Sequence, residues 1–531
     1  MLLTNKAVQH TGLLFVIVIL SFFLFQRSQG QENTGMTLYE RLLRVEIPVK
    51  SDNETYRIIP LAEQGLMVFY KSLEIADQGK IKWYFSLYDA DLRIQWSKGI
   101  AINNTLEYFD FSLDSDTLNL LFYNNSKEKT PDQNIQIIRI SFQKSIFIGI
   151  QGILPENAEP VDFKVCHHKA YIGFNSKNGP ARMMIIELFS GKSMTFSFTQ
   201  QEVSLLAEFL IDTTDGKVIS AVRKIFAKNQ AGFVLSVFDS SGRSIGETNL
   251  NSNAGGNDLK SVSILPDTSG EFIILGTYGT SSGQKSSKNH IPEESTGIYF
   301  TSVKDFKQQS ISFYNFLEFK NAHLLSGENE MDALKKKAQK KNKNLNEYSL
   351  GLTVVLHPPS QDHNQIILLA ESFFPQYHTE NFTDFDFYGR PFTNTYTIFD
   401  GYRFRNAIVA GFDKSGKLLW DNIMEIRNLL SIDLKTKVNV FPSQNNNVLA
   451  YLSEGKVASK IIHQGEVIEK IDFSPIESGL PNDKILTETK SRMIPWYKNF
   501  FICYGYQEIK NVSLDNNNKR WVFYFNKIRF E

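Results

Sequence analysis

The sequence has little cysteine: only Cys166 and Cys503 occur in 531 residues. A small secreted scaffold held together by disulfides needs many more, so that class is excluded. Each cysteine lies inside an apolar, strand-like run, and both are expected to be buried free thiols. The run Cys166–His168 contains residue types that bind metals, but no further Cys or His follows at a ligand spacing. We therefore expect no metal and no cofactor.

An excess of charge of one sign is also lacking, because Lys+Arg and Asp+Glu both number 57. Nucleic-acid-binding proteins normally carry a basic excess, so a nucleic-acid partner is not expected. The sequence contains no G-x-S-x-G, no P-loop and no G-x-G-x-x-G opening a helix, and so no linear catalytic motif. Hydrophobic residues make up 42% of the chain, which is enough to form folded cores.

One long apolar run is present, at the N-terminus. Lys6 precedes the 14 residues "GLLFVIVILSFFLF" from Gly12 to Phe25. This length suits the core of a signal peptide and is short for a bilayer span of about 20 residues. The small residues Ser28 and Gly30 follow at the spacing of a cleavage site. We predict a signal peptide at 1–30, a secreted or periplasmic location and no membrane span after cleavage; an uncleaved anchor is the alternative.

Most of the remaining chain reads as short strands. Runs such as "GLMVFYKS" (65–72), "IQIIRISF" (135–142) and "GFVLSVFD" (232–239) are rich in β-branched and aromatic residues. They are bounded by Asn, Asp, Gly and Ser, as strands and hairpins are. Long helical periodicity is nearly absent, so we expect an all-β fold.

A unit of strand, tight polar turn and strand recurs along the sequence. The turns begin at residues Tyr88, Phe142, Phe189, Phe238, Val303, Phe412 and His463, at spacings of 54, 47, 49, 65, 109 and 51. Four strands in about 50 residues are typical of a propeller blade. The last unit, 499–530, lacks an outer strand, which 41–49 can supply and so close the ring. The repeat predicts a β-propeller of four-stranded antiparallel blades over 31–531, with eight blades or alternatively seven.

Two stretches carry a resemblance to known proteins. "FDKSGKLLW" at Phe412 resembles the blade hairpins of quinoprotein-like propellers, in which Asp and Gly build the turn and Trp packs between blades. The block 371–420 resembles exported bacterial β-propeller-like proteins with an "F-P-x-Y-x-T-E…Y-G-R-P…F-D-G-Y-R" run. The resemblance implies an exported propeller; it implies no reaction and no quinone ligands.

Two insertions interrupt the repeat. The first, at about 326–348, has acidic residues at its start and six lysines between Lys335 and Lys343. This order complements a helix dipole and predicts one short, solvated helix. The second, at about 375–404, falls between the second and third strands of one blade. Loops this long are uncommon and often functional.

The second insertion contains the candidate site. Aromatic side chains alternate there with polar and charged ones, and the candidate ligand- or partner-binding residues are Tyr377, His378, Glu380, Asp384, Asp386, Tyr388, Arg390, Tyr402 and Arg403. Three interpretations stay open: a loop that plugs or covers the ring, a ligand or partner site, and a catalytic site. Arg390, Arg403 and Arg405 are expected to pair with the carboxylates.

No catalytic residue can be named from the sequence. We favour an exported, non-catalytic propeller that binds a protein or glycan partner or acts as an envelope scaffold. The alternative is a propeller-type hydrolase or lyase whose carboxylates converge at the mouth of the channel from several blades, and therefore leave no linear motif.

Overall fold

The computed structural model describes 39–77, 79–124, 134–200, 203–225, 231–252, 257–267, 270–280, 294–326, 332–333, 336–337, 339–341, 352–362, 365–443, 446–511 and 519–530. The predicted signal peptide lies outside these residues. Within them, no helix is both long enough and apolar enough to cross a membrane.

The first half of the chain forms regular four-stranded antiparallel sheets, each made from four consecutive strands. Their strands are β2 (Arg57–Pro60), β3 (Leu66–Ile75), β4 (Lys80–Tyr88) and β5 (Ile94–Asn103); β6 (Glu107–Asp114), β7 (Thr117–Tyr123), β8 (Ile135–Ser141) and β9 (Ile146–Gly152); β10 (Ala158–Cys166), β11 (Lys169–Ser176), β12 (Arg182–Glu187) and β13 (Ser193–Ser197); β14 (Leu205–Ile211), β15 (Val218–Ile225), β16 (Ala231–Phe238) and β17 (Ser244–Leu250).

The second half is less regular. One sheet has the order β18 (Asn257–Leu259), β20 (Phe272–Thr280), β22 (Gly297–Lys304) and β23 (Lys307–Gln308), with β19 (Ser263–Pro266) on β20 and β24 (Ser312–Asn315) on β22. The next has the order β21 (Glu294–Ser295), β25 (Leu352–Leu356), β27 (Gln365–Phe385), β28 (Pro391–Asp413) and β29 (Leu418–Glu425), with β26 (Ser360–Asp362) on β27 and β30 (Leu430–Ser431) on β28. A regular sheet follows: β31 (Asn439–Ser443), β32 (Asn446–Ser453), β33 (Lys456–His463) and β34 (Glu466–Pro475).

The last sheet joins the two ends of the described chain. Its order is β1 (Tyr39–Val49), β37 (Lys519–Phe530), β36 (Phe500–Asn511) and β35 (Asp483–Pro495). Val45 pairs with Phe525 and Val49 with Trp521 in the antiparallel register of β1 and β37. The prediction that 41–49 supplies the outer strand of the final unit is therefore confirmed.

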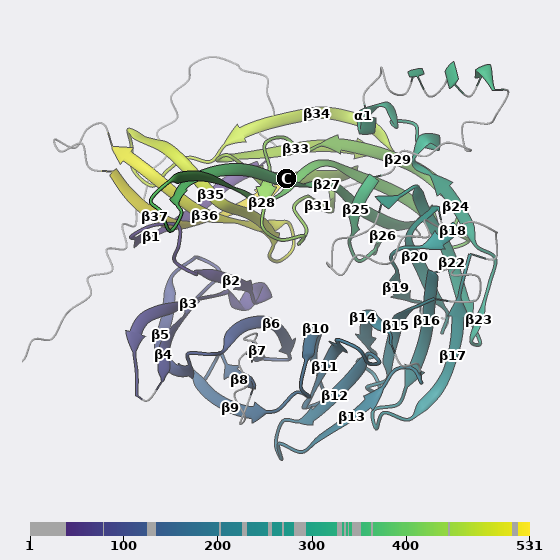
Figure 1. Ribbon diagram of the computed structural model, residues 1–531, viewed down its shortest axis with the longest axis horizontal. Coiled ribbons are helices and arrows are strands. Elements are labelled where there is room, and N and C mark those ends of the chain that lie inside the picture. Colours follow the sequence, from purple (N-terminus) through teal and green to yellow (C-terminus); the bar gives the residue numbers. More distant parts are fainter. Residues whose placement is uncertain are drawn as a thin grey trace, which may run out of the picture.

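The sheets follow one another around a ring in the order of the sequence (Figure 1). In the regular sheets made from four consecutive strands, the first strand (β2, β6, β10, β14 or β31) lies toward the centre, and β10 contacts both β6 and β14 there. Each main hydrophobic core lies between two consecutive sheets. Phe85 and Leu120, for example, share one core, and Val68 and Phe525 share the core that joins the last sheet to the β2–β5 sheet. This arrangement is that of a β-propeller, as predicted.

The predicted tight turns join the last two strands in the order given for their sheets. In three of them an aspartate accepts backbone N–H groups two and four residues further on, at 2.8–3.0 Å; these are Asp89, Asp239 and Asp413. Aspartate side chains favour such turns because they can replace a backbone acceptor. Trp420, which follows the turn at Asp413, is buried in the core between its own sheet and the β31–β34 sheet, as the resemblance implied.

Helical segments are few in the described part of the chain: η1 (Ala62–Gln64), η3 (Phe316–Glu318) and α1 (His323–Ser326). Most of the helix predicted at 326–348 lies outside the described residues. Of its residues, 332–333, 336–337 and 339–340 are helical.

The segment predicted as a loop at 375–404 is instead regular β-structure. Strands β27 and β28 continue beyond their sheet as a two-stranded ribbon, paired from Tyr377–Phe399 to Phe385–Pro391 (Figure 1). Threonine, tyrosine and phenylalanine are enriched in strands, and cross-strand pairs such as Tyr377–Phe399 stabilise the ribbon. We call residues 377–399 the arm.

Candidate functional site

The arm ends in the same kind of turn as the blade hairpins. Asp386 accepts hydrogen bonds from the backbone N–H groups of Tyr388 (2.9 Å) and Arg390 (2.8 Å). Gly389 has a φ of +74°, in the left-handed region that favours glycine. Asp386 therefore shapes the turn and is not free to form a cation site with Asp384, whose carboxylate accepts a hydrogen bond from Asn394 at 2.9 Å.

The two faces of the arm differ in chemistry. Paired residues share a face, and successive pairs alternate between the faces. One face carries Thr and Asn in the pairs Thr379–Thr397, Asn381–Thr395 and Thr383–Thr393. The other carries the pairs His378–Ile398, Glu380–Tyr396, Phe382–Asn394 and Asp384–Phe392. This second, mixed face includes three of the predicted site residues.

His378 is the centre of a polar group at the base of the arm. Its Nδ1 is hydrogen-bonded to Asp400, and its Nε2 lies 3.2 Å from Glu380 Oε1. Asp400 reaches the histidine because it is the extra residue of a bulge, where the register shifts between Gln376 and Tyr377. The hydrogen bond to Asp400, and then the one to Glu380, raise the pKa of His378.

The aromatic side chains of the arm are in solvent. All residues from 377 to 399 are exposed except Asn394, which is half-buried. Phe387 is 97% exposed and Tyr388 is 79% exposed. The interpretation of this segment as a plug of the ring is therefore wrong.

The predicted site residues do not form one compact site. Tyr388 and Arg390 lie at the tip, where the Arg390 guanidinium is 5.7 Å from the centre of the Tyr388 ring. Tyr402 and Arg403 lie at the base, roughly 40 Å along the strand at about 3.3 Å per residue. The expected arginine–carboxylate pairs are absent within 365–443: Arg403 Nε donates to Gln376 Oε1 at 2.8 Å, and Arg405 lies over Phe374.

The inner strands bring together carboxylates that the sequence did not single out. Asp110, Asp162 and Glu208 occupy the same place on β6, β10 and β14, each just after a bulge. Burial raises the pKa of Asp110, and the charges of Lys435, Asp162 and Lys164 also act on it. The recurrence of "FDF", "VDF" and "AEF" at 109–111, 161–163 and 207–209 was a signal that could have identified them.

Glu208 is the most perturbed of these carboxyl groups. Its Oε2 accepts a hydrogen bond from the backbone N–H of Ile264 at 2.9 Å. Burial nevertheless raises the pKa of Glu208 to about 7. Because Lys164 and Asp162 act electrostatically on both Asp110 and Glu208, these groups lie near one another in the middle of the ring.

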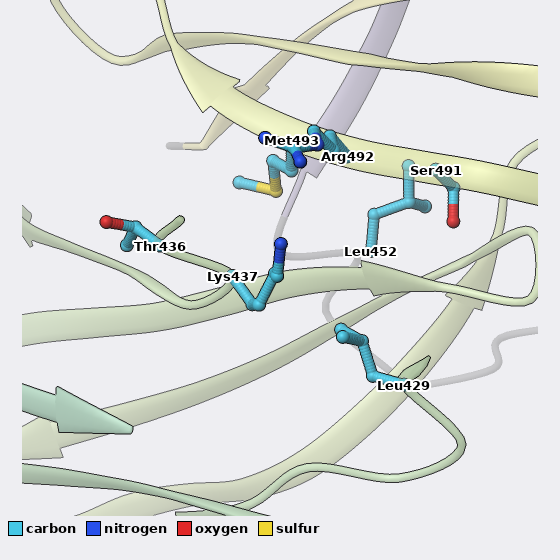
Figure 2. Close-up of a pocket in the computed structure, with 7 residues that line it drawn as sticks. All are labelled: Leu429, Thr436, Lys437, Leu452, Ser491, Arg492 and Met493. Carbon is cyan, nitrogen blue, oxygen red and sulfur yellow. The ribbon is translucent and has the colours of Figure 1, made fainter. Parts of the chain in front are cut away.

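A second polar cluster lies between the 433–437 segment and β35. Lys437 Nζ is 2.7 Å from Asp433 Oδ1, and Arg492 is paired with the other oxygen of that carboxylate. Burial alone would raise the pKa of Asp433, but Lys437 and Arg492 lower it to about 2. Figure 2 shows the Lys437 ammonium pointing toward Met493 and Arg492, into a small hollow between these segments.

Buried groups hold the 433–437 segment in place. Glu371 is fully buried and accepts hydrogen bonds from the backbone N–H groups of Lys437 (2.9 Å) and Val438 (2.5 Å). His357 Nε2 lies 2.8 Å from Glu371, and its Nδ1 lies 2.8 Å from Thr436 Oγ1. Because an ionised carboxylate can only accept, His357 Nε2 donates its hydrogen bond to Glu371.

No group of three or more His, Cys, Asp or Glu residues in the described ranges is placed to hold a metal ion. Cys166 and Cys503 are both buried free thiols, as expected. His167 and His168, which follow Cys166, form the turn between β10 and β11, with φ values of +48° and +61°.

No family model matches the sequence, and no curated protein is similar to it. Solved structures with a similar shape include the polysaccharide lyase Uly1, at 8% identity and a TM-score of 0.37, covering 92% of this chain and all of that one. The β-propeller domain of the Trilobed protease from Pyrococcus furiosus has 9% identity and a TM-score of 0.33, covering 78% of this chain and 97% of its own. The WD40 domain of Toxoplasma gondii coronin has 7% identity and a TM-score of 0.35, covering 79% and 80%.

These similarities are too weak to indicate a function. The order of the strands, the cores between consecutive sheets and the closure through β1 define the chain as a β-propeller protein.

Proposed function

We propose that this protein is an exported β-propeller that binds a protein or glycan partner through its arm. The observation that carries the proposal is the exposure of the arm's aromatic side chains on a regular ribbon. Exposed aromatic groups on a pre-formed element offer large contact area at little entropic cost. The free edges of the ribbon could pair with an extended peptide, and the rings could stack on sugars.

A photo-crosslinking amino acid at position 387 tests this proposal in the cells that produce the protein. We expect a discrete crosslinked product at Phe387 and none at Ile468, a 56% exposed residue on the outer strand β34. For a glycan partner, titration calorimetry with soluble polysaccharides should show binding that F387S/Y388S abolishes. Equal crosslinking at both positions, together with no polysaccharide binding, would contradict the proposal.

The blade number belongs to the same proposal. The described strands group into eight hydrogen-bonded sheets, which favours eight blades over seven. The N-terminal apolar run supports export with cleavage near Gly30. The intact mass of the secreted protein tests this: a mature chain should begin near Gln31, whereas an uncleaved chain in the membrane fraction would mean an anchor.

A hydrolase or lyase remains the second candidate, because the inner strands place Asp110, Asp162 and Glu208 near one another. A carboxyl group with a pKa near 7 can act as a general acid or base at neutral pH. The test is depolymerisation or hydrolysis of a polysaccharide by the wild type and by Glu208→Gln. Activity that persists in the variant, or its absence in both, would remove this candidate.

A further inference from the structure

We propose that the arm binds an extended, basic peptide segment, which pairs with the free edge of β27 at 377–385 as a third strand of the ribbon. The inference rests on the partner binding proposed for the arm and specifies that partner. Among the described residues, 377–385 pair with β28 and with no other strand. The base of β27 differs, because β25 already pairs there with residues 370–372.

The first argument is the open backbone of the ribbon. In an antiparallel pair, alternate residues direct their N–H and C=O groups away from the partner strand. Residues 377–385 are all exposed, so no described element covers these outward groups. A ribbon of only two strands is marginally stable in water, and a third strand stabilises it. An extended peptide fits this edge because it supplies N–H and C=O groups at the same spacing.

The two edges of the ribbon are not equivalent. The edge on β28 begins at Pro391, which has no N–H group to donate and so hinders pairing. No proline lies in 377–385. On the mixed face, Glu380 and Asp384 are both on β27, whereas the side chains of β28 on that face are uncharged. The backbone and the charge therefore both favour the β27 edge.

The second argument is the charge of the arm and its base. Residues 377–400 contain two groups that can carry a positive charge, His378 and Arg390, and four carboxylates, those of Glu380, Asp384, Asp386 and Asp400. His378 is bonded to Asp400 and Glu380, and Asp384 is bonded to a neutral amide. Four carboxylates against two cations leave an excess of two negative charges, although the whole chain has none.

The position of this charge defines the partner. Glu380 and Asp384 are on the same face of β27, with Phe382 between them. Arg403 and Arg405 lie at the base, so the negative charge lies farther along the arm. A strand paired here has one residue opposite each of the three β27 side chains, and opposite charges in such pairs are favourable. The partner strand should carry basic residues four positions apart and an apolar residue midway.

A synthetic threonine-rich peptide tests the proposal, with two lysines four positions apart and a phenylalanine midway between them. Fluorescence anisotropy should show saturable binding to the purified protein, and binding should weaken as salt rises. The same peptide with glutamates in place of the lysines should bind roughly tenfold more weakly or worse. A version with prolines beside the phenylalanine should not bind, because it cannot pair. If the lysine peptide does not bind, or binds no better than the glutamate peptide, the proposal is wrong.

Hydrogen exchange measured by mass spectrometry locates the bound peptide. The lysine peptide should slow exchange of the backbone amides in 377–385 more than in 391–399, because only the β27 edge gains a neighbouring strand. Equal slowing in both strands, or stronger slowing in 391–399, would contradict pairing at the β27 edge.

Two substitutions that remove a charge with little change of shape make the test specific. Glu380→Gln and Asp384→Asn should each weaken binding of the lysine peptide by about two- to fivefold, because one exposed pair of opposite charges is lost. Glu247→Gln is the matched control, since it removes an exposed carboxylate from β17, the last strand of its sheet. Equal weakening in all three variants would mean that the peptide responds only to overall charge, and would overturn the proposal.

The experiments also separate this inference from the partner binding proposed for the arm. A discrete crosslink at Phe387 without peptide binding would support the arm as a contact surface and reject the strand pairing. Peptide binding without a crosslink in cells would support the pairing and reject contact through the tip. A crosslinked product of twice the mass of the chain would show that the arm meets a second copy, and would overturn the choice of a basic peptide.

Discussion

The indole Nε1 of Trp496 donates a hydrogen bond to the carbonyl oxygen of Gly65, 2.9 Å away, although the two residues are 431 positions apart. The contact ties the last sheet to the β2–β5 sheet. Gly65 has a φ of +118°, and a Cβ built on it would lie 1.8 Å from the carbonyl oxygen of Tyr88. Only glycine fits this position.

Gly65→Ala should therefore destabilise the protein by roughly 2–6 kcal/mol, since backbone strain and overpacking each cost about 1–3 kcal/mol. Gly79→Ala is the matched control, because Gly79 also has a positive φ (+76°) but no atom within 4 Å of the added Cβ. That variant should lose about 1 kcal/mol. Urea unfolding of both variants measures the difference, and equal losses would contradict the close packing.

Removal of β1 should open the ring. Deleting 39–49 exposes the β37 edge and removes one side of a core that includes Val45 and Val49. We expect a large fall in Tm or aggregation on concentration, because an unpaired strand edge recruits other chains. Circular dichroism melts and light scattering measure this. A deletion variant that stays monomeric with an unchanged Tm would show that β1 is dispensable.

Removal of the arm should leave the stability of the ring almost unchanged. Replacing 377–400 with Asn-Gly between the paired residues Gln376 and Gly401 leaves a two-residue hairpin. Since the removed side chains are mostly exposed, the free energy of unfolding should change by less than about 1 kcal/mol. Phe404→Ala, at the buried base, should cost roughly 3–5 kcal/mol. A large loss on removal of the arm would mean that it packs on the ring.

Glu208 should make stability depend on pH. Its pKa in the folded protein is about 7 and lies above the ordinary value of 4.5, so the folded state binds the proton more tightly. Its stabilising contribution is therefore complete below about pH 4.5 and is lost as the pH rises toward 7. Glu208→Gln should raise stability relative to wild type at pH 8 by roughly 1–3 kcal/mol, and less at pH 5. Identical pH profiles for the two proteins would contradict this.

His378 provides a spectroscopic check of the arm. Its pKa is raised by Asp400 and then by Glu380, so its imidazole should remain charged to a higher pH than an exposed histidine without acidic partners. Asp400→Asn should lower that pKa in an NMR titration of the ring protons. Asp384→Asn, on the same face but bonded to Asn394, should leave it unchanged. If both variants titrate like wild type, the His378–Asp400 contact does not form in solution.

The sequence predicted the propeller because its blades repeat the same kind of short turn. Asp89, Asp239 and Asp413 build the same turn from side-chain hydrogen bonds that need only neighbouring residues. The closing role of 41–49 followed from an incomplete last unit. The turns depend only on short stretches of chain, and the closing strand follows from the number of strands in each unit.

The site could not be derived in the same way. The arm was taken for a loop because both of its faces meet solvent, so no continuous apolar face marked it as a strand. The pairing of Asp400 with His378, in place of an arginine, depends on a bulge that spacing does not reveal. Lys437, Asp433 and Arg492 meet only because the ring brings β35 beside the segment before β31.

Closure through β1 also affects how the chain folds. The strand at 39–49 is made early, but its only partner in the final sheet lies beyond residue 518. Until β37 is available, β1 remains an unpaired edge that other chains can capture, and the earlier sheets form an open arc. Contacts between such distant segments slow folding, since a very long loop must close before the pairing stabilises it. The chain is therefore most exposed to aggregation until this last pairing forms.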